Sequence, residues 1–151
     1  MIPAYTKVMK RRLVQAPRFY YFDVGLTQYL LRQTSLERGT PQYGHAFEHF
    51  VIQELIAYIG YYHKDEKLAY WRTHTGIEVD VVIDEAKLAI EIKSTEEIQP
   101  RHLKGLKSFG DDYPEFRKIL VSLDRINRCE NDVELIYIHD FLRMLWKGEL
   151  F

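Results

Sequence analysis

The sequence predicts an α/β fold in which helices flank a mixed β-sheet. Residues 44–62 predict a long helix, because apolar side chains recur there every three or four positions. Residues 77–83 and 88–94 alternate apolar and polar side chains with the period of a β-strand. The expected order is a helix, three strands, a helix, two strands and a final helix, which is typical of an α/β sandwich.

Length and composition predict one globular domain with a short N-terminal extension. The chain has 151 residues, of which 46% are hydrophobic and 28% are charged. Its formal net charge of −1 provides no overall positive field, so binding to nucleic acid would require a local patch of Lys and Arg.

Several classes of protein are excluded. Cys129 is the only cysteine, which excludes an intrachain disulfide and a cysteine-based zinc site. No apolar stretch reaches the roughly 18 residues of a membrane span, and the N-terminus is unlike a signal peptide, so we expect a cytoplasmic protein without a membrane partner. The GxxxxGK[ST] pattern is missing, and therefore no ATP site is expected in this chain.

Residues 1–43 are expected to lead into the domain, which then occupies 44–151. Residues 1–17 are basic and form either a solvated arm or an arm that contacts phosphates. Residues 18–22 predict a short aromatic strand, and 33–43 predict a loop. Asp23 is expected to cap a helix running to about Arg32. The cations of the arm are Lys7, Lys10, Arg11 and Arg12.

The helix at 44–62 is followed by three expected strands at 68–73, 77–83 and 88–94, the last two joined by a turn at 84–87. Glu48 lies on the helix beside its apolar stripe, which is unusual for an acid without a partner. In the second strand one face is expected to carry Ile77, Val79, Val81 and Ile83, and the other Glu78, Asp80 and Val82. In the third strand Leu88, Ile90 and Ile92 oppose Ala89, Glu91 and Lys93.

The C-terminal third predicts a helix at 98–109, opened by Pro100, and strands at 116–123 and 134–139. Asp140 is then expected to cap a final helix. The helix at 98–109 has a basic face that is either solvated or a wall for a phosphate backbone. This face consists of Arg101, Lys104 and Lys107.

The turn at 84–87 brings two acids together if it closes symmetrically. Opposed residues of the hairpin have Cβ atoms about 4.5–5.5 Å apart, so two carboxylates placed there repel each other and favour either a proton or a bridging cation. Oxygen ligands favour Mg²⁺ or Mn²⁺. The opposed pairs are then Ile83 with Leu88, Asp80 with Glu91, and Glu78 with Lys93.

Such a site would hydrolyse phosphodiesters. The metal ligands would be Asp80, Glu91 and the backbone carbonyl of Ile92, with Glu48 reaching in from the helix. The amine of Lys93 would orient or help deprotonate the attacking water, or stabilise charge on a phosphoryl oxygen. Two other interpretations stay open, a solvated sheet face and a network of salt bridges without metal. His45 and His49, four apart on the helix, have no third ligand for zinc.

Asp80 together with Glu91-Ile92-Lys93 resembles the motif of the PD-(D/E)xK nuclease superfamily, although Val79 stands where that motif has proline. Its restriction-endonuclease-like core order, αβββαβ, is similar to the order expected for 44–123. The resemblance implies that Asp80 and Glu91 hold Mg²⁺ or Mn²⁺, that Glu48 is an auxiliary acid, that Lys93 is the catalytic lysine and that the substrate is DNA.

A closer resemblance covers nearly the whole chain, to an uncharacterised C-terminal domain of this fold in bacterial and archaeal AAA-type ATPases. It implies the C-terminal portion of such an ATPase, with the ATPase module as a partner in cis or in trans. The alternative is a catalytically inactive module that binds DNA or a protein partner. The similar pieces are 18–25, Gly44 with Phe47-Glu48, Glu54-Leu55, 70–73, 76–80, 89–94 and 104–106.

Overall fold

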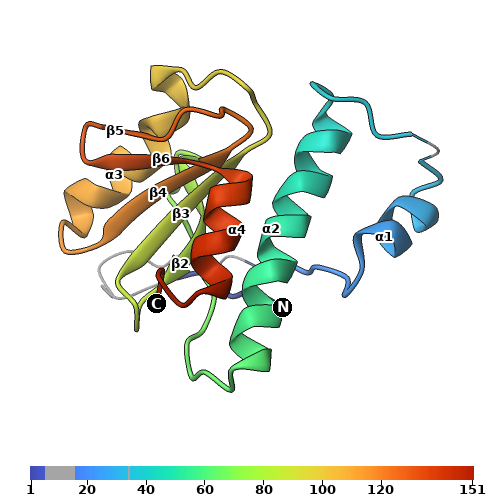
Figure 1. The fold of residues 1–151 in the computed structure, drawn as a ribbon, viewed down its shortest axis with the longest axis horizontal. Helices are drawn as coiled ribbons and strands as arrows, with labels where there is room; N and C mark the ends of the chain where they lie inside the picture. The colour runs from blue at the N-terminus through green and yellow to red at the C-terminus, as the bar shows by residue number, and fades with distance from the viewer. Residues whose placement is uncertain (6–15, 34) are drawn as a thin grey trace.

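The computed structural model describes residues 1–5, 16–33 and 35–151, which form a β-sheet flanked by helices on both faces (Figure 1). The expected cations Lys7, Lys10, Arg11 and Arg12 lie outside the described residues. The helical elements are α1 (Val24–Leu30), α2 (Pro41–Tyr61), the 3₁₀ turn η1 (Pro100–Leu103), α3 (Lys104–Asp112) and α4 (Ile138–Trp146). The strands are β1 (Ala69–Arg72), β2 (Glu78–Ile83), β3 (Leu88–Lys93), β4 (Arg117–Ser122), β5 (Arg128–Glu130) and β6 (Val133–Tyr137).

The sheet is mixed, as the sequence predicts. Its strands lie in the order β1-β2-β3-β4-β6-β5. The β1–β2, β2–β3 and β5–β6 pairs are antiparallel, whereas β3–β4 and β4–β6 are parallel. The succession α2, β1, β2, β3, α3, β4 confirms the expected helix, three strands, helix and strand.

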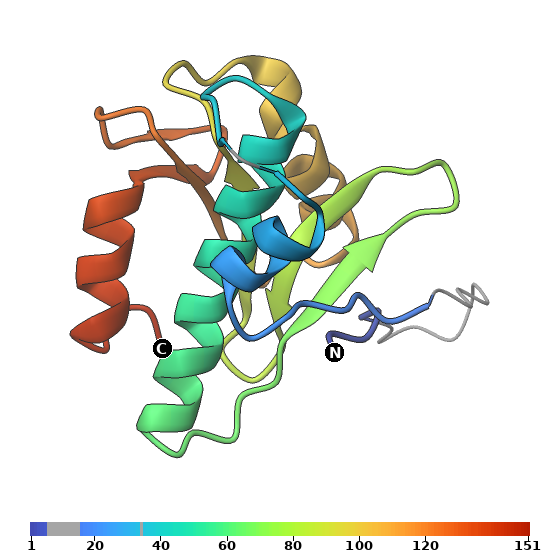
Figure 2. The same cartoon turned by 90° about the vertical axis from the view of Figure 1, so that its right-hand side faces the viewer.

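Two hydrophobic cores lie on opposite faces of the sheet, which explains why its central strands are buried on both sides. Helices α2 and α4 cover one face, and α3 covers the other (Figures 1 and 2). The α2/α4 core contains Leu55, Ile90 and Phe141, and the α3 core contains Trp71 and Phe109. Asp80, Glu91 and Lys93 are therefore attached to a sheet that is packed from both sides, and Glu48 is attached to a helix that covers it.

A β-bulge in β2 overturns part of the expected facing of its side chains. Trp71 pairs with Val79 but Ala69 pairs with Val82, so β2 contains one residue more than β1 over this interval. Val79 consequently packs in the α3 core, whereas Val81 packs in the α2/α4 core. The prediction that Ile77, Val79, Val81 and Ile83 share one face was wrong, because a bulge reverses the alternation at the point where it occurs. The facing of Leu88, Ile90 and Ile92 was correct.

Helix α2 begins three residues earlier than expected. Thr40 caps it, accepting a hydrogen bond from the Tyr43 N–H at 3.2 Å, and Pro41 occupies the first turn, where its missing N–H has no consequence. The occurrence of Gly, Thr and Pro together at 39–41 predicts a loop for both residues, which is wrong. The same residues also form a helix start when a long apolar stripe follows them.

The N-terminal segments differ more from expectation. Residues 18–22 do not form a strand, since only Arg18 is paired there, in an isolated antiparallel bridge with Ile2. Asp23 does cap α1, accepting a hydrogen bond from the Leu26 N–H at 2.6 Å, but the helix ends at Leu30. Residues 3–5 lie beside β1, with Tyr5 N–H donating to the Tyr70 carbonyl at 2.6 Å.

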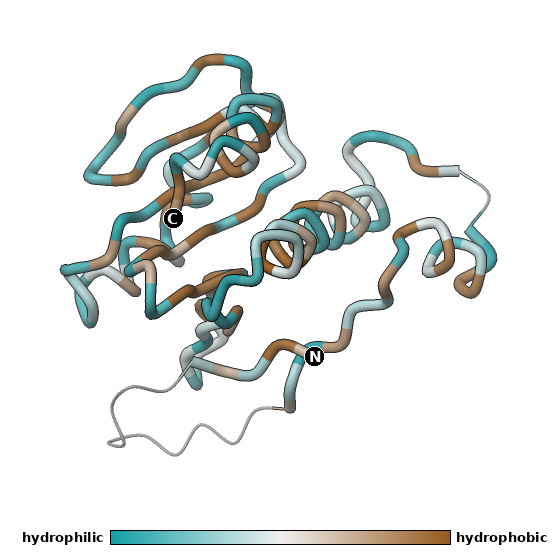
Figure 3. Tube along the Cα trace, turned by 60° about the horizontal axis from the view of Figure 1, so that its bottom comes forward, coloured by the Kyte–Doolittle hydropathy of each residue, from teal (hydrophilic) through white to brown (hydrophobic). Residues whose placement is uncertain are grey.

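Segment 19–31 exposes many apolar side chains, among them Phe22 at 82% and Tyr29 at 79% of their maximal exposure. Figure 3 shows the hydrophobic stretches of this segment at the edge of the molecule, away from the sheet.

Among the described residues no helix combines the length and the apolar character that crossing a bilayer requires.

The C-terminal elements are shifted by a few residues from the prediction. Strand β6 ends at Tyr137, and α4 begins at Ile138, so that Asp140 lies inside the first turn and Tyr137 is the cap residue. An acid in the first turn still favours the helix through its dipole. Strand β5 was not predicted, because its three residues Arg128–Glu130 are too short and too polar for a recognisable pattern.

Candidate functional site

The predicted catalytic residues meet where the ladder between β2 and β3 ends. Its paired residues are Ile83 with Leu88, as predicted, Val82 with Ala89, and Val81 with Ile90. Beyond them, the Asp80 carboxylate accepts a hydrogen bond from the Ile92 N–H at 2.9 Å. The side chain of Asp80 thus replaces a backbone partner at the open end of the hairpin.

Lys93 links the two acids of the motif. Its Nζ lies 2.5 Å from Glu91 Oε1 and 3.9 Å from Asp80 Oδ2. The Asp80 and Glu91 side chains are 5% and 6% exposed, whereas that of Lys93 is 34% exposed. The amine therefore connects two buried carboxylates with the surface.

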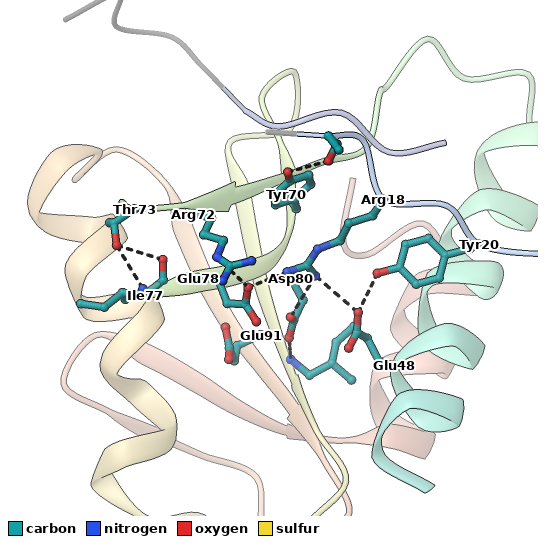
Figure 4. A network of polar contacts seen from close by, with 12 residues as sticks. Arg18, Tyr20, Glu48, Tyr70, Arg72, Thr73, Ile77, Glu78, Asp80 and Glu91 are labelled. Atoms are coloured by element: carbon teal, nitrogen blue, oxygen red, sulfur yellow. Dashed lines mark hydrogen bonds and ion pairs between the residues drawn. The ribbon is translucent and has the colours of Figure 1, made fainter. Parts of the chain in front are cut away.

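Arg18 is a second cation in the site, and the sequence analysis did not assign it there. Its Nη2 lies 2.7 Å from Glu78 Oε2, and its Nη1 lies 3.5 Å from Glu48 Oε1 and 3.6 Å from Asp80 Oδ1. Figure 4 shows Glu48 and Asp80 pointing toward Arg18, with Glu91 on the far side of Asp80 from Glu48. One guanidinium thus contacts three carboxylates.

Glu48 reaches the site from α2, as the sequence suggested. Its Oε1 accepts a hydrogen bond from the Tyr20 hydroxyl at 2.6 Å and faces Arg18. Burial, together with the charge of Glu48, raises the pKa of the Tyr20 phenol well above its ordinary value. Tyr20 therefore stays protonated and remains a hydrogen-bond donor to this carboxylate.

The two motif acids are held in a state that favours protonation. Burial, and then the charge of Asp80, raises the pKa of Glu91 to about 8 even though Lys93 opposes the shift. Burial likewise raises the pKa of Asp80 to about 6, with Glu48 adding to the effect, while Lys93, the Ile92 N–H and Arg18 oppose it. Burial lowers the pKa of Lys93, but Glu91 and Asp80 outweigh it and the net shift is upward. One ammonium cannot neutralise both acids.

One carboxylate oxygen of Glu91, Oε2, is buried without a hydrogen-bond partner. This oxygen lies toward Gly105 of α3, where an added Cβ atom would be 3.1 Å from it. A buried carboxylate oxygen without a partner is costly, so a proton or a cation is the expected complement.

The donor set fits a cation held by two carboxylates. Within residues 1–5, 16–33 and 35–151, no group of three or more His, Cys, Asp or Glu side chains is placed to hold a metal ion. Mg²⁺ is commonly bound through one or two carboxylates, with water and substrate phosphates completing its shell. Asp80 and Glu91 supply two carboxylates for such a shell, while the Ile92 carbonyl stays a predicted ligand.

The basic face of η1 and α3 is exposed as predicted, with Arg101, Lys104 and Lys107 all at the surface. A pocket at the starts of α2 and η1 leads to Lys93. Burial, followed by the charges of Arg101 and Lys93, lowers the pKa of His102 in this pocket. The pocket is lined by Thr40, Gly44, Lys93, Ser94, Arg101 and His102, among others.

A family model described as "Domain of unknown function (DUF4143)" matches residues 43–141, about two thirds of the chain. The chain belongs to this family. No solved structure matches the chain. The match to the DUF4143 domain spans Glu48, Asp80, Glu91 and Lys93, whereas Arg18 lies before it.

Sequence reasoning missed Arg18, Tyr20 and Glu78 as members of the site. Arg18 and Tyr20 alternate with exposed Phe19 and Tyr21, so a period of two was present in the segment taken for a strand. This alternation could have predicted that Arg18 and Tyr20 point toward the protein while Phe19 and Tyr21 point toward solvent.

The histidine pair on α2 does not form a metal site. His45 is exposed, and His49 is buried, with its Nε2 2.7 Å from the carbonyl oxygen of Tyr21. His49 therefore anchors the segment that precedes α1 to the surface of α2.

Proposed function

We propose that this DUF4143 domain is a Mg²⁺- or Mn²⁺-dependent nuclease of restriction-endonuclease-like fold that hydrolyses phosphodiester bonds of DNA. The proposal depends on one observation, the buried pair Asp80 and Glu91 at the end of one hairpin with Lys93 in contact with both. The order α2, β1, β2, β3, α3, β4 agrees with the αβββαβ core of that fold.

The chemistry of the acids supports a cation. Asp80 and Glu91 share one ammonium, and Glu91 Oε2 has no partner, so a divalent ion would satisfy both the charge and the oxygen. A bound Mg²⁺ or Mn²⁺ would supply a water of lowered pKa and neutralise charge in the transition state.

Lys93 acts in this proposal as a donor and not as a base. Because its pKa is raised, the amine stays charged at neutral pH. An ammonium of this kind orients the attacking water or donates to a phosphoryl oxygen as negative charge develops there. Its partial exposure through the pocket beside Arg101 gives a phosphate group access to it.

The wider context follows from the resemblance of segments 18–25, 76–80 and 89–94 to the C-terminal domain of AAA-type ATPases. We propose that the domain works with such an ATPase, in cis or in trans. The exposed cations Arg101, Lys104 and Lys107 would line the path of the DNA backbone.

Cleavage of plasmid and branched DNA in Mn²⁺ tests the proposal. We expect wild type to cleave and Asp80→Asn and Glu91→Gln to lose more than about 100-fold in rate, since a lost ligand costs more than the 10- to 100-fold typical of its supporting residues. Exposed Glu115 provides the matched control, Glu115→Gln, which should retain activity. Cleavage that survives in Asp80→Asn would refute the assigned site.

The second candidate is a catalytically inactive module that binds DNA or a protein partner. The placement of Arg18 favours it, because a guanidinium already neutralises acids that a metal would need. This function predicts DNA or partner binding without cleavage and without measurable Mn²⁺ affinity.

A further inference from the structure

The Arg18 guanidinium is held in the acidic cluster by the chain around it. The Arg18 N–H donates to the Ile2 carbonyl at 2.9 Å, and the Ile2 N–H donates to the Arg18 carbonyl at 2.8 Å. The guanidinium lies 4.6 Å from the centre of the Tyr70 ring. The Tyr70 hydroxyl in turn donates to the Ala16 carbonyl at 3.0 Å. These contacts anchor the backbone of Arg18 beside the acids and place its guanidinium against the Tyr70 ring.

The contacts of Arg18 compete with those that a metal ion needs. Asp80 Oδ2 already accepts from the Ile92 N–H, which leaves Oδ1 for a metal, and Oδ1 faces Arg18 at 3.6 Å. The guanidinium also faces Glu48, the auxiliary acid from α2, at 3.5 Å. A divalent ion on Asp80 would stand within a few ångströms of the guanidinium charge, where repulsion in a poorly solvated site is large.

We propose that Arg18 competes for Asp80 with a divalent cation held by Asp80 and Glu91, and that Glu78 and Glu48 hold the guanidinium in the competing position. This inference rests on the proposed metal-dependent function. The Arg18 guanidinium would leave Asp80 when a divalent ion is bound there, and it would then be free to bind an oxygen of the substrate phosphodiester, for which its planar fork is suited. Metal loading and substrate binding thereby favour each other.

Calorimetric titration of Mn²⁺ into four proteins tests this competition. In Arg18→Ala we expect Mn²⁺ to bind about tenfold or more tightly than in wild type, a gain of about 1.4 kcal/mol, since the ion pair between Arg18 and Asp80 no longer opposes it. Arg72→Ala is the control, because Arg72 also faces Glu78, at 3.8 Å, but is 49% exposed and does not contact Asp80. Its affinity should change by less than about threefold.

The variant Glu78→Gln distinguishes competition between Arg18 and Mn²⁺ from an effect of net charge alone. It also keeps Arg18 in the protein. Removing a negative charge would ordinarily weaken the binding of Mn²⁺. Here it removes the shortest contact of Arg18, at 2.7 Å, so we expect Mn²⁺ to bind more tightly than in wild type. Circular dichroism verifies that each variant is folded.

The outcomes are distinguishable. If wild type binds Mn²⁺ but Arg18→Ala and Glu78→Gln bind it no more tightly, the competition is refuted and the proposed function stands. An equal gain in Arg72→Ala and Arg18→Ala also refutes it, because then only net charge matters. If none of the four proteins binds Mn²⁺, both the competition and the metal-dependent function are wrong.

Discussion

Raising the pH should destabilise the metal-free domain through Glu91. Burial beside Asp80 raises the pKa of Glu91 from 4.5 in its ordinary state to about 8 in the folded protein. The folded state therefore binds a proton more tightly than the unfolded chain does. The stabilisation is fully present below pH 4.5 and is lost as the pH rises through about 8.

The size of this loss in stability follows from the difference between the pKa values of Glu91 in the unfolded and folded states. At about 1.4 kcal/mol for each pH unit, the passage from 4.5 to about 8 corresponds to a free energy on the order of 5 kcal/mol. Asp80 acts in the same direction over a lower window, from 3.8 to about 6. Between pH 5 and pH 9, Glu91 should therefore dominate the loss of stability.

Urea unfolding with a chelator, at several pH values between 5 and 9, measures this effect. We expect the free energy of unfolding of wild type to fall relative to that of Glu91→Gln, whose amide cannot ionise, by several kcal/mol over this range. Glu134→Gln is the control, because Glu134 pairs with Arg117 at 2.7 Å on a half-exposed surface. A constant difference between wild type and Glu91→Gln across the range would refute the protonated, buried state of Glu91.

Three further predictions concern stability. Gly105→Ala should destabilise the domain by about 1–3 kcal/mol in urea unfolding, because its Cβ would lie 2.1 Å from a backbone oxygen of β2, whereas Gly60→Ala in α2 meets nothing within 4 Å and should be neutral or stabilising. Phe109→Ala should cost about 3–5 kcal/mol by the same measurement, since this ring is fully buried among four other aromatic rings. Asp23→Ala removes the cap of α1, worth about 1 kcal/mol, and should speed hydrogen exchange of the α1 amides while leaving the global unfolding free energy nearly unchanged.

The parts of the site that lie on one hairpin could be predicted from the sequence. A four-residue turn fixes the register of its two strands, and Ile83 does pair with Leu88. From that pairing the proximity of Asp80, Glu91 and Lys93 follows by counting. Local geometry is sufficient here because only residues 80–93 are involved.

The parts that depend on irregular backbone could not be predicted. The bulge in β2 turns Val79 toward α3 and Val81 toward α2, although the sequence alternates regularly through both. An apolar side chain at either position can pack on either face of the sheet, since helices cover both faces. The hydrophobic pattern therefore carries no information about where the extra residue is inserted.

Arg18 illustrates a long-range effect. Its three acidic partners lie on α2 and β2, between 30 and 62 residues after Arg18 in the sequence, and only the fold brings them close to it. The two carboxylates expected to require a cation were identified, but the cation supplied by the N-terminal segment was not.

The short segment of residues 1–5 also affects how copies of this protein behave toward each other. Strand β1 is the last strand at its end of the sheet, and Pro3 and Tyr5 bond to Tyr70 along its outer side. An uncovered edge strand pairs readily with the same edge of another molecule. Removing residues 1–5 would thus leave the outer side of β1 without backbone partners and would promote aggregation through this edge. The same truncation would remove Ile2, the backbone partner that positions Arg18.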